Sequence, residues 1–354
     1  LLKTIQLLPG VKSAGEGNSG FFVRGGGADQ NLILLDEAPV YNATHLLGFF
    51  STFNSDAIKD ATIIKGNSPS QYGGRLSSVL DVKMKEGNNQ DYTVNGGIGL
   101  ISSKVSVEGP LQKNKSSFIL SGRRTYADVF LKATEKFKDN ILYFYDLNAK
   151  ANYQINAKNK VYISGYFGRD ELGLGQDFGI DWGNKTGTIR WNKIISNRLF
   201  LNTSLIYSDY NYNVKLKNGE TNFNINSNIK DVNLKQDYTL YANGLNTLRF
   251  GFNSILHTIT PSTFSGTVIN SVAKEGRNGL ENALYLTNNY RANNQLTIDY
   301  GMRLSTYTLM GGDVYNIYEN GIVKSTVKLN RSSFGKTYAN LEPRITTNYR
   351  ISDE

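Results

Sequence analysis

The feature that most constrains this chain is a series of segments in which apolar and polar residues alternate one by one. In residues 296–305 every second side chain is apolar: Leu296, Ile298, Tyr300, Met302 and Leu304 stand between Thr297, Asp299, Gly301, Arg303 and Ser305. Residues 231–240 and 248–256 repeat the pattern. A period of two predicts β-strands with one apolar and one polar face. The alternation alone fits both a soluble sandwich, whose apolar face points to a core, and an outer-membrane barrel, whose apolar face points to lipid.

The connections between these segments favour the barrel. Short polar connections are expected at 112–115, 156–159, 196–197, 242–246 and 292–294, and long ones at 128–140, 173–185, 215–227, 259–280 and 310–339. Short and long connections take turns, as in a meander with tight turns at one rim and long loops at the other. The strands at 200–212 and 296–309 exceed the roughly 5–6 residues of an average strand and suffice to cross a membrane, which takes about 9–11 residues. We expect about twelve strands between Tyr92 and Ile351.

Composition excludes several other classes of protein. The 354 residues include no cysteine, so neither a disulfide nor a thiolate metal site is available. No segment approaches the roughly 18 apolar residues of a membrane helix. The net charge of +9 is spread along the chain without a basic run, so we expect no nucleic-acid partner. The chain starts at Leu1 without a signal peptide, and the strand count leads us to expect an internal piece of a longer cell-surface protein.

The residues before position 88 follow a different pattern. Short apolar runs at 32–35, 61–65 and 79–82 are separated by glycine and polar residues, which predicts short buried strands in a small α+β module. Residues 55–59 are expected to form one helical turn. The chain therefore divides into a small α+β domain at 1–87 and a mainly β, antiparallel strand domain at 88–354.

Five segments of the first domain, in this order, carry a resemblance to a known family: Leu8-Pro9-Gly10-Val11, Phe22-Val23-Arg24-Gly25-Gly26, 32–40 (LILLDEAPV), 57–66 (AIKDATIIKG) and Tyr72-Gly73-Gly74. Together they resemble the C-terminal part of the plug of a TonB-dependent outer-membrane receptor. Leu341-Glu342-Pro343-Arg344 is similar to barrel strands of the same family. The resemblance is greatest to the branch with a carboxypeptidase-regulatory-like extension before the plug, and smaller to the glycan importers that work with a surface lipoprotein.

The resemblance implies a fold and a function. The family's barrel has about 22 strands around a plugged lumen, so this chain would hold the N-terminal half of a transmembrane β-barrel and would not form a pore alone. It implies ligand-gated import of a scarce nutrient, such as a ferric chelate, cobalamin, a glycan or a peptide, across the bacterial outer membrane. The implied partners are TonB with its inner-membrane motor proteins, outer-membrane lipid and the small nutrient ligand, and the barrel would be monomeric. We expect no cofactor, no metal site and no enzymatic activity, since no base stands beside a nucleophile.

The resemblance also assigns roles to particular residues. Arg24 and Lys65 would pair with barrel carboxylates and hold the plug in place. The apical plug loops at 15–19, 27–30 and 41–45 would meet the ligand, through the polar residues Glu16, Asn18, Asp29, Gln30, Tyr41, Asn42 and His45. Two positions depart from the family pattern: Lys65-Gly66 replaces Arg-Gly, and Asp36-Glu37 replaces Asp-Gly. Because residues other than glycine avoid positive φ, Glu37 argues against the usual left-handed turn.

Two other functions stay open at this point. One is an outer-membrane barrel without active transport, such as a passive porin or an adhesin, in which residues 1–87 would be dispensable. The other is a secreted all-β binding protein, which would stay soluble without detergent.

Overall fold

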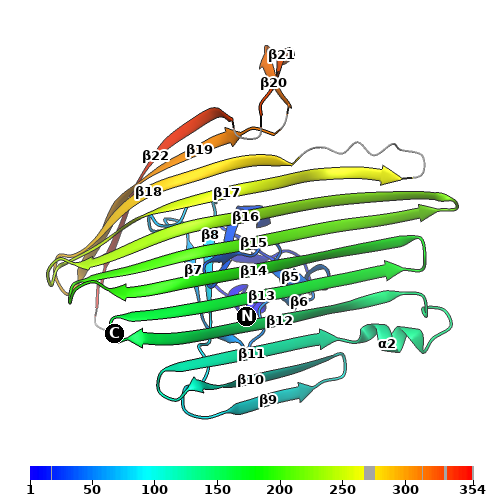
Figure 1. Cartoon of the computed structure of the whole chain (residues 1–354), viewed down its shortest axis with the longest axis horizontal. Coiled ribbons are helices and arrows are strands. Elements are labelled where there is room, and N and C mark those ends of the chain that lie inside the picture. The colour runs from blue at the N-terminus through cyan, green and yellow to red at the C-terminus, as the bar shows by residue number, and fades with distance from the viewer. Residues whose placement is uncertain (17, 267–275, 313, 331–332, 353–354) are drawn as a thin grey trace.

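Twelve antiparallel strands form one curved sheet in the computed structural model of the chain, which describes residues 1–16, 18–266, 276–312, 314–330 and 333–352 (Figure 1). The sheet contains β9 (Thr93–Ile98), β10 (Ser102–Gln112), β11 (Ser116–Thr125), β12 (Ile141–Asn156), β13 (Asn159–Leu174), β14 (Phe178–Ile194), β15 (Leu199–Asn218), β16 (Thr221–Tyr241), β17 (Asn246–Gly266), β18 (Arg277–Arg291), β19 (Leu296–Met310) and β22 (Phe334–Tyr349). Each strand pairs with its neighbour in the chain, except that β22 follows β19. The predicted antiparallel meander of about twelve strands is confirmed, and its two edges are β9 and β22.

The two faces of this sheet differ in chemistry, as β16 shows. Asp231, Asn233 and Lys235 point to the concave side, where they line a cavity. The residues between them, Val232 and Leu234, point outward and are 45% and 44% exposed. The apolar face therefore lies on the outside of the curve and the charged face inside it, as in a membrane barrel and opposite to a soluble sandwich. Among the described helices, none is long and apolar enough to cross a membrane.

The connections at the two ends of the sheet also differ, although not wholly as expected. All five short turns form where they were predicted, at 113–115, 157–158, 195–198, 242–245 and 292–295. At the other end, residues 126–140 contain α2 (Ala127–Lys132), and residues between 310 and 334 contain the separate hairpin of β20 (Val314–Glu319) and β21 (Ile322–Lys328). The long loops predicted at 173–185 and 215–227 are wrong, because the strands there continue to a tight turn.

The β15–β16 turn gives the physical reason. Asn218 pairs with Thr221, so the connection is only Gly219-Glu220, and Gly219 has a φ of 60°. A two-residue loop that starts with a glycine at positive φ suits a type II′ hairpin turn, whose twist matches the flanking strands. The strands β15, β16 and β17 thus reach 20, 21 and 21 residues.

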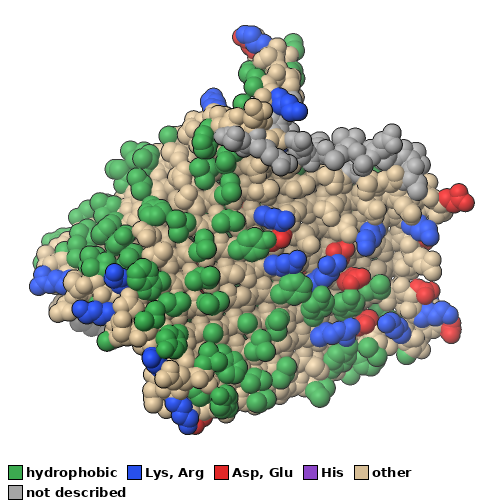
Figure 2. Space-filling model, in the orientation of Figure 1, with side chains coloured by type: hydrophobic (Ala, Val, Ile, Leu, Met, Phe, Trp, Pro, Cys, Tyr) green, Lys and Arg blue, Asp and Glu red, His purple; other side chains and the backbone are tan. Residues whose placement is uncertain are grey.

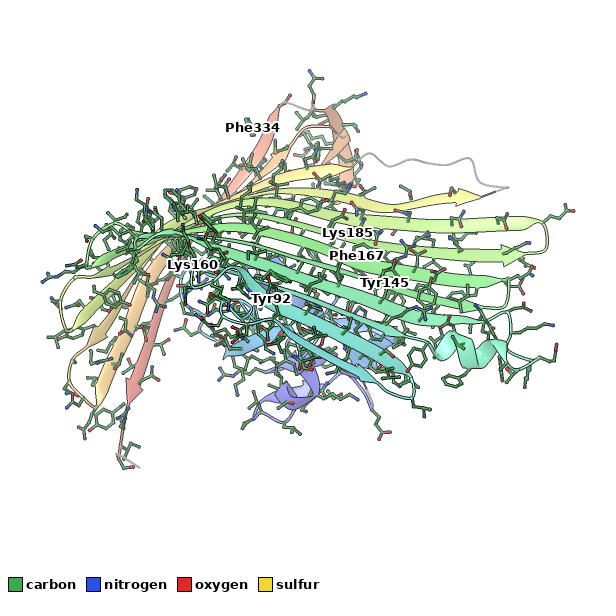
Figure 3. The ribbon with its side chains drawn as sticks, turned by 60° about the horizontal axis from the view of Figure 1, so that its bottom comes forward. Tyr92, Tyr145, Lys160, Phe167, Lys185 and Phe334 are labelled. Carbon is green, nitrogen blue, oxygen red and sulfur yellow. The ribbon has the colours of Figure 1, made fainter. Side chains whose placement is uncertain are left out.

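The outer apolar band covers only part of these long strands. Figure 2 shows a broad apolar band on the outer face, with charged side chains gathered toward the end where the long strands project. Tyr145, Phe167 and Lys185 lie on three neighbouring strands near this boundary (Figure 3); the rings of Tyr145 and Phe167 are 5.8 Å apart, and the Lys185 Nζ lies 5.8 Å from the Phe167 ring. Aromatic rings followed by a cation are typical of a membrane–water interface.

The residues before β9 fill the concave side of the sheet (Figure 1). A four-stranded sheet has the order β4 (Ala38–Pro39), β3 (Asn31–Leu35), β8 (Ser78–Met84) and β7 (Ile58–Lys65). Around it lie α1 (Leu2–Ile5), β1 (Val11–Ser13), β2 (Phe21–Val23), the 3-10 helices η1 (Ala28–Gln30) and η2 (Leu46–Gly48), β5 (Thr44–His45) and β6 (Phe50–Ser51). The helical turn predicted at 55–59 is instead a turn followed by β7, because the Asn54 side chain accepts from the Asp56 N–H and Ala57 already bonds to Lys85.

This plug has a small apolar core of its own. Its buried members are Leu2, Ile5, Val11, Phe21, Val23, Leu35, Val40, Ala43, Phe53, Leu80, Val82 and Met84, with Tyr166 from the wall. The remaining contacts between plug and wall are mostly polar. The plug can therefore keep its own fold while its interface with the barrel depends on hydrogen bonds and ion pairs.

Candidate functional site at the plug–wall interface

A cavity of about 420 Å³ lies between the plug and the inner face of the sheet. The plug contributes parts of β3, β8 and residues 71–75, and the wall contributes inward-facing residues of β13 to β19. Its lining is dominated by charged and amide side chains, among them Glu37, Arg190, Asn233, Lys235, Asp237 and Glu281. A concave polar space of this size is within the range of sites for small hydrophilic ligands.

The turn between β3 and β4 reaches toward this wall. Leu35 pairs with Ala38, so Asp36 and Glu37 alone make the turn, with φ values of 45° and 75°. Both residues are thus left-handed, as in a type I′ turn. The expectation that Glu37 argues against the left-handed turn was wrong. Contacts with the wall explain why the turn forms without glycine.

Both carboxylates of this turn are paired with wall cations. The Asp36 Oδ2 lies 2.9 Å from the Lys150 Nζ, and both side chains are buried. Lys150 also donates to the Met84 carbonyl at 3.0 Å. The Glu37 carboxylate lies 3.1 Å from Arg190 and 3.7 Å from Lys235. A buried pair of this kind is costly to break on one side only, because it leaves an uncompensated charge.

His45 is the centre of a second buried group. Its side chain is 2% exposed and stacks on Phe144 with 4.1 Å between ring centroids. Its Nδ1 lies 2.6 Å from Asp170, and its Nε2 lies 3.4 Å from Asp146. Burial lowers the pKa of His45, but the hydrogen bonds and charges of Asp146 and Asp170 outweigh it and raise the pKa above its usual value. Arg123 also binds Asp146, with its Nε 2.8 Å from the carboxylate.

The turn that follows His45 is strained and exposed. Leu46 and Leu47 have φ values of 47° and 56°, a conformation that side chains rarely adopt. Asp170 holds this turn in place by accepting from the Leu46 N–H at 2.7 Å. Leu47 is 58% exposed and Phe49 is 64% exposed. Backbone strain of this kind is concentrated at functional sites. Residues 46–49, in which Leu47 and Phe49 are exposed while Leu46 and Gly48 are buried, are called the plug tip below.

Tyr41 and Asn42 lie in the chain between the Asp36–Glu37 turn and His45, and both contact the wall. The Tyr41 hydroxyl donates to Asp231 at 2.5 Å, and its N–H donates to Asn184. Burial, together with Asp231, raises the pKa of Tyr41, so the phenol stays protonated and donates. Asn184 in turn donates to the Asn42 carbonyl at 2.8 Å.

A second plug segment, Ser68 to Gly74, is held by two wall arginines. Arg344 donates to the carbonyls of Ser68, Pro69 and Tyr72 at 2.8 to 2.9 Å. Arg303, which is 1% exposed, donates to the Ser70 carbonyl at 3.3 Å. Gly73 faces the Arg303 guanidinium so closely that a Cβ there would lie 2.5 Å from its Nε. A side chain at position 73 would therefore displace the Arg303 guanidinium from its present position.

The other residues predicted for ligand contact lie apart from this wall. Asn18 lies beside the plug tip, where its amide donates to the Leu47 carbonyl at 3.3 Å. Glu16 is exposed near Asn18, whereas Asp29 and Gln30 belong to η1 at the start of β3. Tyr41, Asn42 and His45 are thus brought together along one wall, Asn18 joins them at the tip, and no contact in the described structure joins Asp29 or Gln30 to them.

Arg24 and Lys65 have surroundings that differ from the expected ones. Lys65 donates to the Pro9 carbonyl at 2.8 Å, a contact within the plug. Among the described residues, neither Arg24 nor Lys65 forms an ion pair with a wall carboxylate, so their pairing stays a prediction. In the ion pairs of Asp36 and Glu37 the plug supplies the carboxylates and the wall supplies the cations. The expected arrangement was the opposite, with cations on the plug and carboxylates on the wall.

Sequence reasoning missed the wall cations Lys150, Arg190, Lys235, Arg303 and Arg344. A signal was present, since each occupies a polar position in an alternating segment and therefore points inward. Nothing in a single sequence, however, shows which inward cation lies opposite which plug residue.

Comparison with known proteins agrees with this architecture. Residues 1–79 match the family model described as TonB-dependent Receptor Plug Domain. Among solved structures, the copper transporter OprC has a TM-score of 0.70 at 11% identity, covering 99% of this chain and 57% of its own. The FrpB iron transporter from Neisseria meningitidis (F3-3 variant) has a TM-score of 0.69 at 11% identity, and the alignment covers 100% of this chain and 60% of FrpB. The unliganded ferric citrate transporter FecA has a TM-score of 0.66 at 14% identity, and the alignment covers 100% of this chain and 58% of FecA.

At these identities the likeness to solved structures establishes the fold. The chain spans between 57% and 60% of the length of these three proteins. Curated protein sequences gave no significant match.

Proposed function

Since residues 1–79 belong to the plug-domain family of TonB-dependent receptors, and the strands after them have the fold of that receptor barrel in the bacterial outer membrane, we propose that the protein carrying this chain imports a scarce nutrient across that membrane. Import is gated by ligand and energised by TonB. The proton-motive force reaches the plug through TonB and its inner-membrane motor proteins.

The observation that carries this proposal is the way in which the plug is held. The wall contacts described above are separate polar groups around Asp36, His45 and Ser68–Gly74, and the plug core is small and belongs almost wholly to the plug. In such an interface each polar group can be broken locally without disrupting the apolar core of the plug. A passive porin has no need of a plug that fills its lumen.

We assign ligand recognition to the plug tip and the loops beside it. Glu16 and Asn18, with the exposed Leu47 and Phe49, offer polar and apolar contacts on one side, and Asp29 and Gln30 offer polar contacts at the start of β3. Tyr41 and Asn42 lie below the tip. His45 is buried and acts as a support: it holds the strained tip against Asp170, so that a ligand pressing on residues 46–49 is coupled to the wall.

The structural relatives suggest the first substrate class to test. They are named as transporters of copper, iron and ferric citrate, so a metal chelate is the first candidate. Cobalamin, a glycan or a peptide follows if a chelate fails.

The test is the abundance and activity of the full-length receptor in outer membranes from iron-replete and iron-starved cells. Induction by starvation, together with uptake of a radiolabelled ferric chelate that is lost without TonB, is the expected result. Uptake that continues without TonB would contradict energised import and favour a passive porin. If abundance does not change with iron, the substrate is another nutrient, and mass spectrometry of copurified ligand is the next step.

A further inference from the structure

Two cavities lie along the same four strands of the wall. The first is the 420 Å³ cavity described above, and the second, of about 440 Å³, lies between the plug and β16 to β19 and β22. On β16 the first cavity is lined by residues 231–237 and the second by Tyr241; on β17 the corresponding residues are 253–257 and 247–249. On β18 the first cavity is lined by Glu281 and the second by Thr287 and Asn289. On β19 the first is lined by Arg303 and the second by residues 299–301. On every strand, the second cavity lies closer to the short turns.

One plug segment, from Ser68 to Gly74, contributes to the lining of both cavities. Gln71 lines both of them, whereas Ser68 to Ser70 face the second cavity and Tyr72 to Gly74 face the first. On the wall side, Arg303 faces the first cavity and Arg344 the second. The loop from Ser68 to Gly74 and these two arginines thus form a partition across one continuous polar wall.

This partition is held by hydrogen bonds and contributes nothing to the apolar core. None of its residues belongs to the buried core cluster of the plug. Its attachment consists mainly of backbone carbonyls that accept from Arg344 and Arg303. The loop is bounded by Gly66 and Gly74, whose φ values are 88° and 76°, a conformation that glycine adopts without strain. The loop can therefore swing away from the wall without unfolding β7 or β8, once the Tyr72 hydroxyl releases the Asp81 carboxylate of β8, to which it donates at 3.2 Å.

The first cavity also has unused hydrogen-bonding capacity. Asn233 lines the cavity and is 6% exposed, and its side-chain oxygen is buried without a hydrogen-bond partner among the described residues. The oxygens of Asn192 and Asn253, in the same lining, also lack partners. Buried acceptors without partners are costly, and rotation of these side chains toward the cavity would let a solute that carries hydroxyl or amine donors satisfy them.

We propose that the two cavities are successive compartments of one transport route along β16 to β19, and that the loop from Ser68 to Gly74 is the gate between them. The first compartment takes a small solute rich in hydroxyl or amine donors. This inference rests on the proposed import function. It adds that the plug opens at the wall that carries Arg303 and Arg344.

Cross-linking in the full-length receptor tests the gate. The chain contains no cysteine, so an introduced pair is the only thiol pair that this chain contributes. The Asn67 amide donates to the Thr346 hydroxyl at the base of the loop, so N67C with T346C ties the loop to the wall. The matched control is N54C with S121C, which replaces a bond of the same type, 2.9 Å long, between the plug and β11. Each pair is joined by oxidation or by a short bismaleimide, and TonB-dependent uptake is measured.

The gate predicts that the N67C–T346C tether lowers uptake at least tenfold, and that the N54C–S121C tether leaves it nearly unchanged. Uptake blocked by both tethers would mean that the whole plug leaves the wall, and uptake blocked by neither would place the route elsewhere; either result overturns the proposal. The same variants without the cross-link should import normally. If they and the wild type all fail to import in a TonB-dependent way, the proposed function itself fails.

A second pair of variants tests the route without any cross-link. Asn253 faces the first cavity, whereas Phe252 beside it on β17 faces outward because neighbours on a strand point to opposite faces. Asn253→Trp should narrow the compartment and lower uptake at least tenfold, while Phe252→Trp should leave uptake unchanged. Equal uptake in the two variants, at equal abundance in the membrane, would overturn the proposed route.

Discussion

Asp36 and Glu37 adopt a strained backbone conformation, and this conformation brings their carboxylates into contact with cations of the wall. Left-handed backbone costs a residue other than glycine about 1–2 kcal/mol. Here both turn residues adopt it, and both carboxylates reach cations on three wall strands. A glycine would relax the turn but would leave Arg190 and Lys235 without this counter-ion.

Substitution of Glu37 separates the two effects. Glu37→Ala removes the carboxylate and keeps the strained Cβ, whereas Glu37→Gly removes both. Both variants should lower the stability of the plug in the barrel, with Gly more stable than Ala by about 1 kcal/mol, the reverse of the usual order. Hydrogen exchange of β8 in the purified receptor measures the difference. An alanine variant as stable as the glycine variant would show that the turn carries no strain.

His45 predicts a pH dependence of the plug tip. Its pKa is raised in the folded protein, because Asp146 and Asp170 outweigh the effect of burial. A raised folded pKa gives a stabilisation that is fully present below the unfolded value of about 6.5 and is lost as the pH rises through the folded pKa. Exchange protection of residues 44–51, corrected for intrinsic rates, should therefore fall over that range. His45→Gln should abolish this pH dependence, and an unchanged slope in that variant would contradict the assignment.

At the scale of elements, the wall strands are longer than a membrane requires. β15 and β16 have 20 and 21 residues, and a strand needs about 9–11 to cross. The outer face of the projecting part is polar, with Asn211 opposite Asn228 and Asn213 opposite Asn226. This part is therefore a hairpin outside the lipid and adds little to the stability of the barrel.

Shortening this hairpin should leave insertion intact. Deletion of residues 212–227, with Asn211 and Asn228 joined through an Asn-Gly turn, should preserve membrane insertion and heat-modifiable migration on a gel. Removal of residues 204–207 and 232–235 is the control, because it shortens both strands inside the apolar band and should abolish folding. Loss of folding in the first deletion would show that the projecting ladder is needed for assembly.

An element could be predicted from the sequence when residues adjacent in the chain determine it. Alternation and polar turns identified the twelve strands and all five short connections, because each depends on residues adjacent in the chain. The loops expected at 173–185 and 215–227 were wrong, since polar residues on both faces were taken as loop although Asn218-Gly219 is a hairpin signal. The partners of Asp36 and Ser68 were beyond prediction, because they depend on how the plug is seated in the wall.

At the scale of the whole molecule, the sheet is curved but open. Its edge strands β9 and β22 are not paired with each other, so rows of N–H and C=O groups remain without strand partners. In lipid each such group costs several kcal/mol. Further strands are therefore required to close the barrel around the plug.

This openness can be tested with the chain itself. Residues 1–354 alone should give no steady conductance in a planar bilayer, while a plug-deleted full-length receptor should conduct. The plug-deleted receptor is the control for insertion. A stable channel from residues 1–354 would show that twelve strands close by themselves.

The charge arrangement between plug and wall has a consequence for how such receptors diversify. Asp36 and Glu37 need the cations Lys150, Arg190 and Lys235 opposite them, and a plug with reversed charges would meet repulsion at the same positions. At these positions plug and barrel are therefore matched in charge. Recombination between receptor genes would preserve these ion pairs when the plug and the barrel are exchanged together, so we expect the two domains to be inherited together.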